Sequence, residues 1–423
     1  MSAMNALSTM IASAEPAMQA VTAATLLRNT AATRERANAL LTRARAGQSD
    51  WFTISEDAAV DSAAQIVAGV TRERYGDGPI PYHSRWRHFE AGGVDRRAEL
   101  DRALGDISAA ERARVHVDLV VISVLLDAGA GPDWQYTEIA SGQQFGRSEG
   151  LGVASFRAFT NGLFSSDPLR PCRADATALR ALTSAQLGAA FQVSSSNPLV
   201  GLDGRVALLR GLGEAMASQS GVFGTNGRPA GVFDTLTRNL IALDAHEILW
   251  LLLTTLSEVW PAPNRIAGIA LGDCWRHTSV RGEGITDGWM PFHKLSQWLT
   301  YSLLEPFEWA GINVTGLSAL TGLPEYRNGG LLLDAGVLVP RNSALLDRTW
   351  QVSDEFIVEW RALTVALLDE LAPRVRSILG KTEAEMPLAC VLEGGTWAAG
   401  RAMAQKLRGG TSPIKIASDG TVF

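Results

Sequence analysis

The sequence predicts a mainly α-helical, multi-helix globular fold with a few short β-strands. Apolar residues recur at helical spacing in several long stretches, most clearly in residues 354–371, where Phe356, Trp360 and Leu363 share one face. Alternating strand patterns are rare, and the regular strand–helix alternation that builds a parallel sheet is missing. We therefore expect more than half of the chain to be helical, without a parallel sheet of five or more strands.

The chain has 423 residues, of which 46% are hydrophobic, so it can bury a large core. We interpret residues 1–20 as a loose N-terminal arm and residues 21–423 as a single large helical domain. This domain could have two lobes with the cleft between them. No segment recurs at a period of 20–50 residues, which argues against a repeat protein.

Composition argues against several classes of protein. The net charge is −6 without a block of Lys and Arg, whereas a nucleic-acid binder usually has a basic face. The longest apolar run, residues 248–253, is too short to cross a bilayer. Three well-separated cysteines indicate neither a disulfide framework nor a zinc motif, and the N-terminus lacks the pattern of a signal peptide. We therefore expect a cytoplasmic protein without a nucleic-acid or membrane partner.

The helical elements can be placed in order. Two helices are predicted within residues 1–50, and another, which ends at Gly69, is predicted within residues 57–69. Residues 139–172 are predicted to be mostly loop, because Gly, Ser and Pro are interspersed there. Further helices are predicted at 115–127, 175–192, 203–217, 233–260, 289–309 and 386–408. The helix at 233–260 could be one helix or a broken pair, and the one at 386–408 is interrupted at Gly394–Gly395. A short strand pair is predicted in the C-terminal tail.

A segment rich in Gly and Pro, residues 75–93, is too broken for a long helix. It nevertheless carries six polar or aromatic residues almost side by side: His83, Arg85, Trp86, Arg87, His88 and Phe89. One interpretation is a surface loop whose arginines reach into solvent. The other is a pocket wall that offers hydrogen-bond donors to a hydroxylated or phosphorylated ligand.

Two glutamates stand in apolar surroundings near glycines: Glu325 in LPEYRNGG and Glu393 in VLEGGTW. A buried carboxylate costs several kcal/mol unless it is paired. Glu325 is therefore either held by Arg327 or kept as a reactive group with a tuned pKa, unless it simply complements a helix N-terminus. Two carboxylates that flank a glycosidic carbon are the usual equipment for cleavage of C–O or C–N glycosyl bonds. Phosphate-loop, dinucleotide, H-E-x-x-H and G-x-S-x-G motifs are absent.

Five motifs together resemble the uracil-catabolism protein family of fungi and bacteria, over about residues 20–423. They are SRWRHFEAGG, VHVDLVVISVLLDAGAGPDWQYTE, GLPEYRNGGLLLDAGVL, LEGGTWAAGR and SDGTV. The resemblance implies a role in the pyrimidine degradation route that does not use dihydropyrimidine chemistry. In that route uracil becomes a nucleotide, its ring is opened, and a ribosylurea species is cleaved to urea.

A more distant resemblance is to the queuosine salvage N-glycosidases, which are helical proteins akin to DNA glycosylases. Their acidic-Tyr-Arg motif corresponds to Glu325-Tyr326-Arg327, which implies that Glu325 is the catalytic carboxylate. Leu323 stands where those enzymes place an aromatic side chain against the base, and their later acidic-x-x-x-Trp element resembles Glu393 to Trp397. Leucine in place of the aromatic residue fits a smaller leaving group, such as urea.

The sequence thus predicts a hydrolase of N-glycosyl bonds that releases urea from ribosylurea or its 5-phosphate. Glu325 is the expected nucleophile or cation stabiliser, and the expected substrate-binding residues are His83, Arg85, Arg87, His88, Leu323, Tyr326, Arg327, Glu393 and Trp397. No metal or cofactor is expected, and a homo-oligomer is left open. The alternatives are a uracil phosphoribosyltransferase and a non-catalytic scaffold for the ring-opening enzyme of the route.

Overall fold

The computed structural model describes residues 17–238, 242–260 and 263–417. Helices make up 58% of the structure and strands 9%, which confirms the predicted mainly helical fold. Within the described ranges every sheet has only two strands.

The helices begin with one over residues 17–27. In chain order the others are α2 (Thr30–Arg45), α3 (Asp57–Tyr75), α4 (Trp86–Phe89), α5 (Arg96–Leu104), α6 (Ala109–Leu125), α7 (Arg147–Thr160), α8 (Ala176–Ala181), α9 (Ser184–Ala190), α10 (Leu202–Ser218), α11 (Ser220–Phe223), α12 (Gly231–Thr237), α13 (Ala245–Thr255), α14 (Lys294–Trp309), α15 (Tyr326–Asp334), α16 (Glu355–Leu379), α17 (Leu388–Val391) and α18 (Trp397–Arg408).

The strands are short, and three of the six described pairs join segments that lie far apart in the sequence. The antiparallel pairs are β1 (Phe52–Ile54) with β10 (Leu338–Pro340), β2 (Gln135–Glu138) with β3 (Gln143–Gly146), β5 (Arg265–Ile266) with β6 (Ile269–Ala270), and β7 (Cys274–Arg276) with β8 (Trp289–Pro291). The parallel pairs are β4 (Ala242–Asp244) with β9 (Asn313–Thr315), and β11 (Thr349–Trp350) with β12 (Lys415–Ile416).

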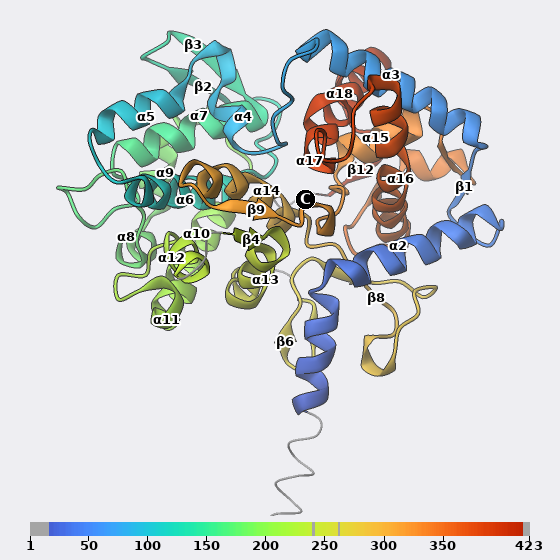
Figure 1. Ribbon diagram of the computed structural model, residues 1–423, viewed down its shortest axis with the longest axis horizontal. Helices are drawn as coiled ribbons and strands as arrows, with labels where there is room; N and C mark the ends of the chain where they lie inside the picture. The colour runs from blue at the N-terminus through green and yellow to red at the C-terminus, as the bar shows by residue number, and fades with distance from the viewer. Residues whose placement is uncertain (1–16, 239–241, 261–262, 418–423) are drawn as a thin grey trace, which may run out of the picture.

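The helices form two groups around α14 (Figure 1). Helices α5 to α12 lie on one side, and α3 lies with α15 to α18 on the other. One hydrophobic cluster, which extends from Ala37 to Ile414, includes residues of both groups. The interpretation of these groups as two lobes stays a prediction. Residues 1–16 of the expected N-terminal arm lie outside the described residues, and residues 17–20 belong to the first helix.

Glycine accounts for two differences from the predicted elements. Helix α3 does not end at Gly69 but continues to Gly76, whose φ of 56° favours glycine. Helix α7 lies in the segment that we expected to be mostly loop. Its glycines are needed for close packing, because a Cβ on Gly152 would lie 2.8 Å from the Cβ of His88. Glycine there brings α7 against α4 rather than breaking the chain.

The expected interruption at Gly394–Gly395 is a π-helical turn over Leu392–Thr396, between α17 and α18. Added side chains would collide with α3, since a Cβ on Gly395 would meet the carbonyl oxygen of Val67. Such π-turns are rare and often occur at functional sites. This turn carries Glu393.

Other boundaries also shift. Residues 233–260 are broken into α12, β4 and α13, and α16 is longer than predicted because it continues through Pro373. The C-terminal tail contributes only β12, and residues 418–423 lie outside the described residues. Among the described helices, none combines the length and apolar character needed to cross a membrane.

Candidate active site

A cavity of about 420 Å³ brings together seven of the ten residues that the sequence predicts for the site. These seven are His83, His88, Leu323, Glu325, Tyr326, Arg327 and Trp397. Its wall is built from the N-terminal ends of α7, α14, α15 and α18, from the α4 region, and from the loops that follow α6 and α18. The site is therefore assembled from segments spread over most of the chain.

Glu325 is the N-cap of α15 and at the same time lines this cavity. Its Oε2 accepts a hydrogen bond from the backbone N–H of Arg327 at 2.7 Å, and its Oε1 accepts one from Asn328 at 2.6 Å. The interpretation of Glu325 as a helix-start residue is thus confirmed. The alternative that the Arg327 side chain holds it is wrong, because the backbone amide makes the contact.

The ionisation of Glu325 is set by opposing effects. Burial raises the pKa of its carboxyl, while Lys294, the two backbone N–H groups and His83 lower it, and the net result is a raised pKa. Its side chain is nearly buried, with 8% of the residue exposed. Two backbone hydrogen bonds fix both oxygens without neutralising the charge, so the carboxylate can act on a ligand in the cavity.

His83 faces the cavity with Glu393 behind it. The His83 Nδ1 lies 2.8 Å from Oε2 of Glu393, whose Oε1 also accepts hydrogen bonds from Arg74 and Tyr75. Burial raises the pKa of Glu393, but His83 and Arg74 outweigh this and lower it to about 2. The ionised Glu393 therefore receives the proton on Nδ1, which leaves Nε2 of His83 for the cavity.

His88 presents the opposite tautomer. Its Nδ1 lies 3.0 Å from Nη1 of Arg85, and because a guanidinium only donates, this ring nitrogen is an acceptor. Burial and the Arg85 charge lower the pKa of His88 to about 4, so the ring is neutral near pH 7. The proton then sits on Nε2, where it can be donated. Thus Nε2 of His83 can accept a hydrogen bond from a ligand, whereas Nε2 of His88 can donate one.

Three predicted site residues do not line the cavity. Glu393 lies one hydrogen bond behind it, because its carboxylate is occupied by His83 and its other partners. Arg85 is buried, with Asp127 at 2.9 Å, and Arg87 binds Glu305 at 2.7 Å. The expectation that these two arginines reach a ligand directly is therefore corrected: their guanidiniums are committed to carboxylates in the protein.

The sequence analysis missed three charged residues of the wall: Asp127, Arg147 and Lys294. Lys294 is the first residue of α14, and burial lowers its pKa although Glu325 and Asp127 raise it. The chain has only four lysines, and this one stands in an otherwise apolar stretch, which was a signal that could have been used. Nothing in the sequence places Asp127 or Arg147 beside Glu325.

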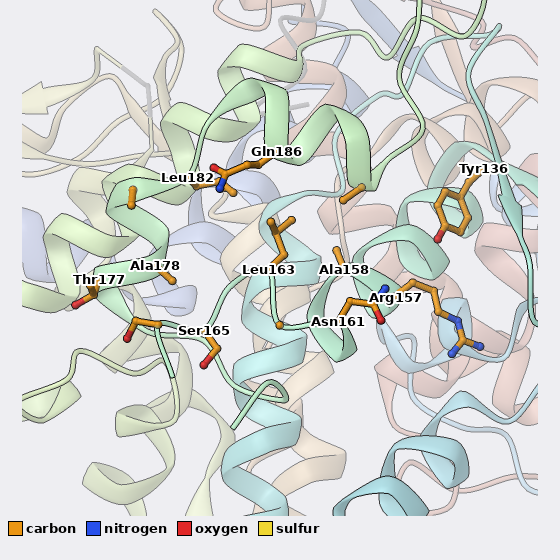
Figure 2. A pocket seen from close by; sticks show the side chains of 14 residues that line it. Tyr136, Arg157, Ala158, Asn161, Leu163, Ser165, Thr177, Ala178, Leu182 and Gln186 are labelled. Atoms are coloured by element: carbon orange, nitrogen blue, oxygen red, sulfur yellow. The ribbon is translucent and has the colours of Figure 1, made fainter. Parts of the chain in front are cut away.

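A second, larger pocket of about 580 Å³ has a different chemical character (Figure 2). Its lining is mostly neutral, and its charged residue, Arg157, extends away from Leu163 and Ser165. Arg157 is also bound to Glu99 and Glu138. This pocket lacks a cavity-facing carboxylate, so we take the smaller cavity as the candidate active site. In the described part of the chain, no group of three or more His, Cys, Asp and Glu residues could hold a metal ion.

Comparison with known proteins places this chain in a family. Residues 26–423 match the family model described as "Protein of unknown function (DUF1688)". The chain belongs to this family. It is 45% identical over 358 residues to "Protein urg3" of Schizosaccharomyces pombe, covering 81% of this chain and 84% of the relative. It is 37% identical over 412 residues to "Uracil catabolism protein 4" of Lachancea kluyveri, covering 89% and 93%. The family resemblance predicted from the motifs is thereby confirmed.

Proposed function

We propose that this protein acts in uracil catabolism, where it hydrolyses the N-glycosidic bond of ribosylurea or its 5-phosphate and releases urea. The names of the relatives, "Protein urg3" and "Uracil catabolism protein 4", support the pathway. The reaction rests on one observation: a capped, buried glutamate shares a cavity with two histidines of opposite tautomer. The cytoplasmic location and the small-molecule partner predicted from the sequence are part of this proposal.

Glu325 is the group that acts on the sugar. Cleavage of the C1–N bond develops positive charge on the ribose ring, and an ionised carboxylate in a water-poor cavity stabilises that charge. The backbone hydrogen bonds to Arg327 and Asn328 hold the carboxylate in place before the substrate arrives. Water supplies the oxygen of the new C1–O bond.

The histidines handle the protons. His83 takes a proton from the attacking water on Nε2 and returns it to the urea nitrogen as the C1–N bond breaks. Glu393 holds the imidazolium that forms in between through the 2.8 Å contact to Nδ1. His88 donates from Nε2 to the urea oxygen, which draws charge from the leaving nitrogen. In sum, one water molecule is added and the enzyme returns to its starting state.

The test is incubation of the purified protein with ribosylurea and with its 5-phosphate, followed by assay of urea and of the free sugar. We expect equal amounts of both products without added metal or diphosphate. Conversion of uracil and phosphoribosyl diphosphate to a nucleotide and diphosphate, dependent on Mg²⁺, would instead support the phosphoribosyltransferase. Binding to the ring-opening enzyme without any turnover would support the scaffold.

A further inference from the structure

Two guanidiniums at one end of the cavity, those of Arg147 and Arg327, form no ion pair with a carboxylate of the described residues. Arg327 lines the cavity and is only 4% exposed, yet its Nε has no hydrogen-bond partner in the described part of the chain. Its Nη1 donates a long hydrogen bond of 3.4 Å to the carbonyl of Gly410. The rings of Tyr326 and Trp397 lie 4.7 and 6.0 Å from its Cζ and restrict its position. A buried cation in this condition is destabilising unless a ligand completes it.

Arg147, which is exposed, also reaches Gly410. Its guanidinium nitrogens lie 3.5 Å from where a Cβ on Gly410 would be. Arg147 has a φ of 53°, a strained conformation for a residue with a side chain, and it is the first residue of α7. A cation at a helix N-terminus is unfavourable, because the positive end of the helix dipole is already there. Glu149 already lies in the first turn of α7, and the Arg147 side chain lines the cavity, where it can reach an anion.

Several buried guanidiniums elsewhere in the described chain are paired within the protein, although single nitrogens of Arg85 and Arg173 also have no hydrogen-bond partner. Arg96 binds Glu138, Arg361 binds Asp273, and Arg205 donates to four backbone carbonyls. Arg327 contacts the carbonyl of Gly410 and the side chain of Tyr326, and Arg147 is exposed. Among the arginines of the described chain that have an unpartnered buried nitrogen, only Arg327 lines the cavity.

We propose that this end of the cavity binds the phosphate of a ribosyl 5-phosphate substrate, between Arg147, Arg327 and the loop Gly410–Ser412. Two guanidiniums match the double negative charge and the several oxygens of a phosphate monoester better than a carboxylate does. The Ser412 Oγ accepts from the backbone of Ile414 at 3.4 Å, so its own proton is free to donate to a phosphate oxygen. The N-terminal ends of α7 and α15 add their dipoles. This inference rests on the proposed function and selects the phosphorylated form of its substrate.

The experiment measures binding without turnover, by isothermal titration calorimetry of the intact protein with ribose 5-phosphate, ribose, inorganic phosphate and acetate. We expect ribose 5-phosphate to bind at least about tenfold more tightly than ribose. Arg147→Gln should weaken ribose 5-phosphate about tenfold and leave ribose unchanged. The matched control is Arg281→Gln, which removes the charge of a 75% exposed side chain outside the cavity and should change neither affinity.

Equal affinities for ribose and ribose 5-phosphate would overturn the inference, as would tighter binding of acetate than of phosphate or an unchanged affinity in Arg147→Gln. The failure of the proposed function looks different. Arg147-dependent binding of ribose 5-phosphate without urea release from either substrate would overturn the reaction and support the anion subsite. Urea release with the same kcat/KM from ribosylurea and its 5-phosphate would support the proposed reaction and overturn the phosphate subsite.

Discussion

Glu138 and Glu325 are both buried glutamates, but they differ in what their oxygens contact. The Glu138 carboxylate accepts from Arg96 at 2.8 and 2.5 Å, from Arg157 at 2.7 Å and from Ser141 at 2.6 Å. We call these four residues the Glu138 cluster. Glu325 accepts only from two backbone amides and turns toward a cavity with Lys294 and His83.

The pKa values show the same contrast. Burial raises the pKa of both carboxyl groups, but in the Glu138 cluster the hydrogen bonds from Arg96, Ser141 and Arg157 outweigh it and lower the pKa to about 2. For Glu325 burial prevails, and the pKa is raised. A glutamate saturated by cations stabilises the fold, whereas one left partly unsatisfied in a cavity has capacity for a ligand. Each prediction below tests this distinction.

The largest effect is expected on the stability of the fold, for the substitution Glu138→Gln. The substitution leaves the buried guanidinium of Arg96 without a counter-charge and Arg157 with Glu99 alone, which should lower the free energy of unfolding by about 3–5 kcal/mol. Turnover per folded molecule should stay nearly unchanged. Guanidinium chloride denaturation beside the urea-release assay measures both, since urea as denaturant would obscure the product. Glu370→Gln, which breaks the exposed pair with Arg45, is the matched control and should cost less than about 1 kcal/mol.

The same cluster predicts a pH dependence of stability. The folded-state pKa of Glu138, about 2, lies below that of an unfolded glutamate. Its contribution is therefore complete above the unfolded pKa and is lost as the pH falls toward 2. If Glu138→Gln removes that contribution, the stability gap between variant and wild type should close over this acid range. A gap that stays constant from neutral pH to pH 2 would contradict the assignment.

Next comes Glu325→Gln, on turnover. It should lose at least about 100-fold in kcat, on the order of 3 kcal/mol, because the charge that stabilises the ribose cation is gone. Substrate binding should change much less. Loss of the N-cap carboxylate should cost about 1 kcal/mol of stability, which a melting curve reveals. Glu325→Asp should keep some activity. Unchanged turnover in Glu325→Gln would end the glycosidase proposal, since Glu325 would then be a capping residue alone.

A smaller effect is expected for Glu393→Gln, which acts through His83. Turnover should fall about tenfold, as the imidazolium of His83 loses its partner at 2.8 Å. The decisive measurement is a double-variant cycle with His83→Asn. If Glu393 only positions His83, the double variant should be no slower than His83→Asn alone. Additive losses would show that Glu393 has a separate role.

The smallest effect is expected for Lys294→Met, on the pH profile. The ionised form of Glu325 is the active one, so turnover should fall as the pH drops through its raised pKa. Lys294 opposes that raised pKa, and its removal should move the acid limb of kcat to higher pH. Lys406→Met, an exposed lysine outside the cavity, should leave the limb in place. If the acid limb lies at the same pH in the wild type, Lys294→Met and Lys406→Met, the ionisation of Glu325 does not set the pH dependence of turnover.

The features that local sequence determines were predicted. The apolar periodicity of α16 depends only on neighbouring residues, so a single segment reveals it. The role of Glu325 as a helix-start residue is equally local, because an N-cap binds amides two and three positions ahead. The motifs also identified seven residues of one cavity without any distance information.

Only the tertiary structure decided which charged side chains pair with other residues of the protein and which can bind a ligand. The sequence around Arg85 and Arg87 is typical of a ligand-binding loop, but both arginines are paired within the protein: with Asp127, in the loop after α6, and with Glu305, on α14. Lys294 and Arg147 enter the cavity because α14 and α7 begin there. These ion pairs form only when segments far apart in the chain come into contact. The free energy of a buried charge is set by the partners that it finds there and not by its residue type.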